Sequence, residues 1–165
     1  MKKNYSLLIL ATFMVIILSS CSEKKSDQPD IVNDLFPEAQ SELREVIESI
    51  YMDCETANLE GLKAIHLASN KFTKFGPRSF ERQDVKSTNE SEVAHFGSIS
   101  NFKAELKDLK IDVFGDVGIA TYYPHVTFEK DGVEKSGSAR QTLVLLKTSE
   151  GWKIIHEHGT MRCQE

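Results

Sequence analysis

The chain has 165 residues, of which 27% are charged and 40% are hydrophobic, so it is long enough for one ordinary globular domain. Its formal net charge is −5; without Lys2 and Lys3, which lie in the leader described below, 18 basic side chains stand against 25 acidic ones, a net charge of −7. Nucleic-acid binding requires a basic surface, so this balance argues against a nucleic-acid partner.

Residues 1–20 predict a secretory signal peptide. Lys2 and Lys3 form its positive start, and residues 7–18 form an apolar run that is too short for a membrane-spanning helix. The run ends at Leu18-Ser19-Ser20-Cys21, which resembles a bacterial lipobox. The resemblance implies cleavage before Cys21 and attachment of a diacylglycerol and a further acyl chain, such as palmitate, to this residue. An unmodified cysteine after a simple secretory signal is the alternative.

The mature chain is therefore expected to be a lipid-anchored protein of the bacterial cell envelope, with the membrane as a partner through Cys21. Residues 21–37 are charged, contain two prolines and predict a flexible tether, and residues 38–165 predict a single domain. The residue after Cys21 is Ser22, whereas enteric lipoproteins that stay in the inner membrane carry an Asp at this position. Ser22 therefore favours the outer membrane. Cys54 and Cys163 are expected either to pair or to remain two free thiols.

Helical periodicity follows the tether. Apolar residues at i, i+3, i+4 and i+7 predict a helix over residues 38–57, and Asn58 predicts the cap of a second helix over residues 59–67. Short strands are expected at residues 71–75 and 80–85. A third helix is expected to reach about residue 102, with Thr88 or Asn89 as its cap.

The rest of the chain predicts four long antiparallel strands, over residues 106–114, 117–129, 134–147 and 151–161. Asp131-Gly132 is a strong hairpin signal between the second and third of them. Helices followed by a strand meander indicate an α+β fold.

The last strand carries the richest chemistry. At a period of two, Trp152, Ile154, His156 and His158 would share one face, with Glu157 on the other. Two imidazoles on one face suit acid–base chemistry or metal binding, but a metal site needs a third ligand, for which His125 is the candidate. A structural or ligand-shaping role is the favoured interpretation, and no metal or cofactor is expected.

The closing segment Gly151-Trp152-Lys153-Ile154-Ile155-His156-Glu157-His158-Gly159-Thr160 resembles the terminal strand of SnoaL-like domains in the nuclear transport factor 2-like superfamily. Arg140-Gln141-Thr142-Leu143-Val144 is similar to the family's penultimate strand, and Gly115-Asp116-Val117-Gly118-Ile119-Ala120 to its mid-sheet turn. The resemblance implies a cone-shaped, curved antiparallel sheet wrapped around about three N-terminal helices. It also implies a pocket on the concave side and frequent homodimers.

The resemblance does not imply one activity, because family members include isomerases, dehydratases, cyclases and a kinase association domain. We expect a small apolar or amphipathic ligand in the concave pocket, with His156, His158, Arg140 and Tyr123 as binding residues. An isomerase, dehydratase or cyclase that uses a pocket histidine is one alternative, although no buried Asp base is apparent. A structural dimerisation or protein-interaction module is the other.

Overall fold

The structure is a computed structural model that describes residues 29–77 and 79–162. The predicted signal peptide, Cys21 and Cys163 lie outside the described residues. Three helices and five strands follow one another in the order α2 (Pro37–Thr56), α3 (Leu59–Ile65), β1 (Thr73–Phe75), α4 (Val85–Phe96), β2 (Ser100–Phe114), β3 (Val117–Lys130), β4 (Val133–Thr148) and β5 (Gly151–Met161).

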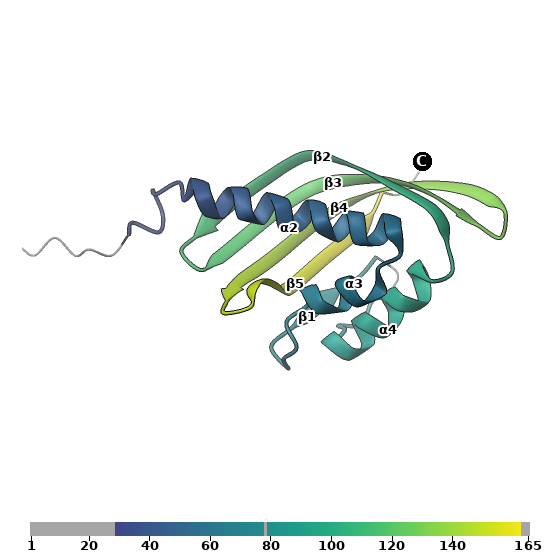
Figure 1. Ribbon diagram of the computed structural model, residues 1–165, viewed down its shortest axis with the longest axis horizontal. Coiled ribbons are helices and arrows are strands. Elements are labelled where there is room, and N and C mark those ends of the chain that lie inside the picture. The colour runs from purple at the N-terminus through teal and green to yellow at the C-terminus, as the bar shows by residue number, and fades with distance from the viewer. Residues whose placement is uncertain (1–28, 78, 163–165) are drawn as a thin grey trace, which may run out of the picture.

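The five strands form one sheet in the order β1-β5-β4-β3-β2. Strands β2 to β5 are the antiparallel meander that the sequence predicts, whereas β1 pairs with β5 in parallel. The helices all lie on one face of the curved sheet and leave the other face uncovered (Figure 1). The predicted α+β class is confirmed.

Helix α2 forms the core with the sheet because its apolar stripe faces the strands. Leu43 and Ile47 on this stripe are completely buried. Gly118 on β3 allows the helix to approach, since a Cβ at this position would collide with the Leu43 side chain. At the same end, the Trp152 indole donates a hydrogen bond of 2.9 Å to a carboxylate oxygen of Glu42.

Asn58 caps α3 as predicted, accepting a hydrogen bond of 3.2 Å from the Gly61 amide. The predicted start of α4 is wrong. Asp84 is its cap: its carboxylate accepts from the Ser87 amide at 2.8 Å, and the Ser87 hydroxyl accepts from the Asp84 amide at 3.1 Å. This capping box begins the helix at Val85 and displaces the strand expected at residues 80–85.

A bulge in β5 overturns the predicted strand faces. Leu145 of β4 is opposite Ile154, but the preceding residue, Val144, is opposite His156, so Ile155 is an extra residue. One extra residue reverses the alternation of side chains beyond it. Ile154 therefore faces the helices, and beyond the bulge Glu157 is buried on that same face while His156 turns to the uncovered one.

Candidate functional site

A cavity of about 460 Å³ lies between the helices and the covered face of the sheet. Most of its wall is aliphatic or aromatic and comes from α2, α3, α4 and the sheet. The apolar side chains include Ile50 and Leu62 from the helices and Phe102, Leu143 and Ile154 from the strands. A cavity of this size and lining is typical of a site for a small organic molecule.

One wall of the cavity carries four ionisable side chains, His66, Lys74, Glu92 and Glu157, which we call the charged cluster. One oxygen of Glu157 lies 2.8 Å from His66 Nε2, and the other lies 2.8 Å from Lys74 Nζ. Lys74 Nζ also forms an ion pair with Glu92. The cluster thus joins four segments, namely the end of α3, β1, α4 and β5.

Asn89 completes the hydrogen bonding of His66. Its side-chain oxygen lies 2.7 Å from His66 Nδ1, so both ring nitrogens face oxygen acceptors. A ring that donates from both nitrogens is an imidazolium. Burial alone would lower the pKa of His66, but the bonds and charges of Glu157, Glu92 and Asn89 outweigh it and raise the pKa above the ordinary value of 6.5.

Glu157 and Lys74 are also held in their charged forms. Burial would raise the pKa of the Glu157 carboxyl, but the charges and hydrogen bonds of Lys74 and His66 lower it well below its usual range. Burial disfavours charge on Lys74, yet the two carboxylates raise its pKa. Two positive and two negative groups therefore face one another, and the cluster is neutral as a whole.

A pair of tyrosines forms a second polar point in the wall. The hydroxyl oxygens of Tyr51 on α2 and Tyr122 on β3 lie 3.2 Å apart, and their rings meet edge to face. Burial raises the pKa of both phenols, and it raises the pKa of the neighbouring Cys54 thiol. All three groups are therefore neutral at physiological pH.

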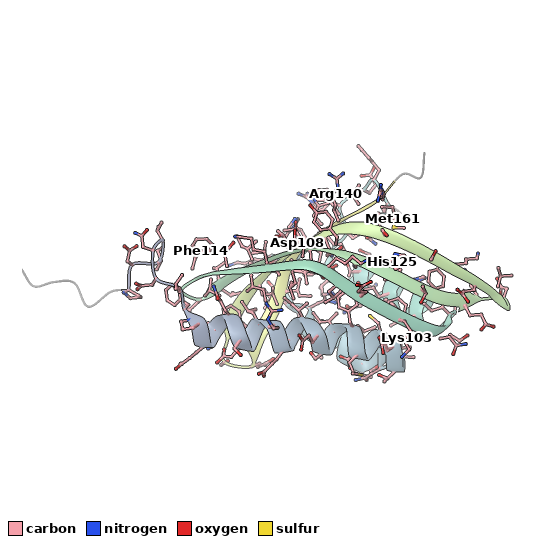
Figure 2. All side chains as sticks on the ribbon, turned by 90° about the horizontal axis from the view of Figure 1, so that it is seen from above. Lys103, Asp108, Phe114, His125, Arg140 and Met161 are labelled. Carbon is pink, nitrogen blue, oxygen red and sulfur yellow. The ribbon has the colours of Figure 1, made fainter. Side chains whose placement is uncertain are left out.

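None of the four binding residues expected from the sequence lines this cavity. His156 and His158 lie on the uncovered face beside Phe75, and His156 Nδ1 lies 2.8 Å from the Thr73 hydroxyl. Arg140 is exposed and points away from α2 (Figure 2). Tyr123 is exposed, whereas its neighbour Tyr122 lines the cavity. Ligand binding by His156, His158, Arg140 and Tyr123 remains a prediction, and the lining of this cavity does not support it.

The sequence interpretation did not include His66, which is buried. A single histidine after a short helix carries no signal of its partners, since Asn89 is 23 and Glu157 is 91 positions away. Glu157 had a usable signal. It is an acidic residue on a strand that also buries Trp152 and Ile154, and a buried acidic group needs a charged partner.

His66, Glu92 and Glu157 also meet the geometric minimum for a metal site, with one ligand atom each within 4.8 Å of one another. Lys74 is bonded to both carboxylates, however, and His66 donates its Nε2 proton to one of them. A divalent cation would have to displace the ammonium and deprotonate the imidazole. The donor set fits an ion-pair network better than a metal centre.

Comparison with solved structures identifies the class of fold. A candidate dehydratase of the NTF2-like family from Streptomyces avermitilis superposes with a TM-score of 0.71 at 15% identity, covering 78% of this chain and 99% of its own. An NTF2-like superfamily protein from Salmonella enterica gives 0.70 at 20% identity, covering 78% and 94%. The CaMKII hub of S. rosetta gives 0.62 at 21% identity, covering 74% and 96%.

These likenesses show that the chain has the NTF2-like fold. The profile of the SnoaL-like domain matches residues 43–163, and the chain therefore belongs to the SnoaL-like domain family. The comparison with curated proteins gives no match. Among the described residues, no helix combines the length and the apolar character needed to cross a membrane.

Proposed function

We propose that this SnoaL-like domain binds a small molecule with an apolar body and a neutral polar head group, and that a lipid on Cys21 holds it at a bacterial membrane. The observation that carries the binding proposal is the cavity of about 460 Å³ whose largely apolar lining includes the charged cluster. Apolar walls with a few convergent polar groups favour an amphipathic ligand.

The charge balance of the cluster supports a neutral head group. Lys74 and His66 already face Glu92 and Glu157, so an anionic ligand would meet two carboxylates and a cationic ligand two cations. A hydroxyl, carbonyl or amide group adds no net charge to this buried site, where unpaired charge is costly. The tyrosine hydroxyls offer such a group further hydrogen-bonding partners.

The same cluster argues against strong acid–base catalysis. A carboxylate whose pKa is lowered by Lys74 and His66 is a weak base, and both nitrogens of His66 are engaged. Binding is thus better supported than an isomerase, dehydratase or cyclase activity, and a partner-binding module without a ligand would leave the cavity without a role.

Ligand extraction tests the binding proposal. The protein purified from its source bacterium is denatured, and the released small molecules are identified by mass spectrometry. Ile50→Trp places a large ring in the cavity, whereas Met52→Trp on the same helix is exposed to solvent and serves as the control. We expect a released molecule from the native protein and from Met52→Trp, and its loss from Ile50→Trp.

Equal recovery of ligand from both variants would refute binding in this cavity. If a recovered ligand is chemically converted on incubation with the protein, the site is an enzyme after all.

The anchor is supported by the lipobox at residues 18–21, in the part of the sequence before the described residues. Cys21→Ala should block lipid attachment, and we expect the variant to leave the membrane fraction or to keep its uncleaved signal. A cleaved variant that still sediments with membranes would refute the anchor. Ser22 favours the outer membrane, which separation of inner and outer membranes on a density gradient tests.

A further inference from the structure

The short segment before α2 exposes three large apolar side chains within five residues of sequence. Ile31, Val32 and Leu35, which we call the apolar tip, are 51%, 74% and 75% exposed. A soluble domain gains nothing from this exposure, because each of these side chains would be more stable out of water. The tip therefore indicates an interaction surface.

The tip is held in a defined shape. The Asp30 carboxylate accepts hydrogen bonds of 3.1 Å from the amides of Val32 and Asn33, and the Asp34 amide donates to the Asp30 carbonyl at 2.8 Å. An Asp that bonds to the backbone two and three residues ahead fixes a turn. The turn holds the backbone that carries Ile31 and Val32 in a defined conformation.

The tip lies at one end of the sheet, beside the turn between β2 and β3. Ile31 Cγ2 is 3.8 Å from the position that a Cβ on Gly115 would take. The adjoining Phe114, 39% exposed, is at this same end of the molecule (Figure 2). Its ring extends the apolar surface from the N-terminal segment onto the sheet.

The position of Cys21 in the chain indicates what covers this surface. Only eight peptide links separate Cys21 from Pro29, the first described residue, and they span at most about 28 Å. A lipid on Cys21 would keep this end of the domain closer to the bilayer than any other. We propose that the apolar tip inserts into the bilayer surface and fixes the orientation of the domain, an inference that rests on the proposed lipid anchor.

The charges around the tip specify the kind of bilayer. Asp30, Asp34, Glu38 and Asp116 are acidic neighbours of the apolar side chains in the sequence or across the turn. Anionic headgroups would repel them, because surface charges of one sign disfavour each other at short range. The tip is therefore suited to zwitterionic lipids, in contrast to the basic segments that bind anionic membranes.

Depth-dependent quenching of tryptophan fluorescence tests this proposal. The mature lipidated protein, which begins at Cys21, is reconstituted in phosphatidylcholine vesicles that contain brominated lipids. Val32→Trp and Leu35→Trp each add a reporter at the tip, over the constant background of the buried Trp152, the single native tryptophan. Val133→Trp is the control, because Val133 is also exposed, at 57%, and begins β4 at the β3–β4 hairpin, which lies at the opposite end of the sheet from the β2–β3 turn (Figure 1).

We expect strong quenching of both tip reporters, consistent with insertion about 5–10 Å into the boundary between headgroups and acyl chains, and none of the control. Phosphatidylglycerol vesicles should reduce the quenching at the tip. Tip reporters that are quenched no more than Val133→Trp, in protein with lipid on Cys21 by mass spectrometry, would overturn the insertion and leave the anchor in place. A Cys21 without lipid would overturn both.

Discussion

The charged cluster makes a quantitative prediction about Lys74. Its ammonium is bonded to both carboxylates, and the side chains of Lys74 and Glu157 are only 14% and 7% exposed. Lys74→Met removes the cation and leaves Glu92 and Glu157 facing His66 alone. Loss of one partner from a buried ion pair costs about 3–5 kcal/mol, a large fraction of the 5–15 kcal/mol that stabilises a typical domain.

Urea unfolding followed by the fluorescence of Trp152 measures this loss. The matched control is Lys103→Met, because Lys103 pairs with Glu55 at 3.0 Å but its side chain is 71% exposed. Such a surface pair contributes about 0–1 kcal/mol. If Lys74→Met lowers the free energy of unfolding no more than Lys103→Met does, the cluster does not stabilise the fold and our argument fails.

Glu157→Gln provides a second check on the same reasoning. It leaves Lys74 paired with Glu92, and His66 is then free to lose its proton, so we expect a smaller loss than in Lys74→Met. The double variant should lose less stability than the sum of the two single losses, because residues of one network are coupled. Strict additivity would show that Lys74 and Glu157 act independently.

Four further predictions follow from the described residues. The raised pKa of His66 adds stability that is fully present below pH 6.5 and is lost as the pH rises through the folded-state pKa of His66. The lowered pKa of Glu157 adds stability that is present above pH 4.5 and is lost as the pH falls through the folded-state pKa of Glu157. The free energy of unfolding should therefore peak between pH 4.5 and pH 6.5, and His66→Gln should flatten its decline at alkaline pH. Thr88 has a buried hydroxyl with no partner among the described residues, so Thr88→Val should raise the free energy of unfolding by about 1 kcal/mol, seen as a higher melting temperature. Gly118→Ala should lower the unfolding free energy by about 1–3 kcal/mol, because the methyl group collides with Leu43. The uncovered sheet face should form a homodimer, so light scattering should give twice the chain mass at micromolar concentration and the monomer mass for Tyr123→Lys.

Much of the architecture could be predicted because it rests on long periodic segments. The apolar stripe through Leu43 and Ile47 placed α2 correctly to within a residue or two, and Asp131-Gly132 located the β3–β4 hairpin. The parallel pairing of β1 with β5 could not be predicted, since three residues carry too little pattern to show a partner.

The candidate site was predictable only in part, and one reason is a single extra residue in β5. The extra Ile155 leaves no trace in composition, yet it exchanges the faces of every residue after it. The interpretation therefore assigned His156 to the face of Ile154 and overlooked Glu157. The start of α4 was mistaken for a different reason: Ser87 completes the capping box of Asp84 where the more familiar pattern has Glu or Gln.

The long-range contacts of the charged cluster have a consequence for the order of folding. His66 and Glu157 meet across 91 positions of sequence, and β1 has no strand partner until β5 exists. Contacts between distant segments form late, because closing a long loop costs conformational entropy before the contact is made. The N-terminal half therefore cannot complete the charged cluster until the last strand, β5, has been synthesised.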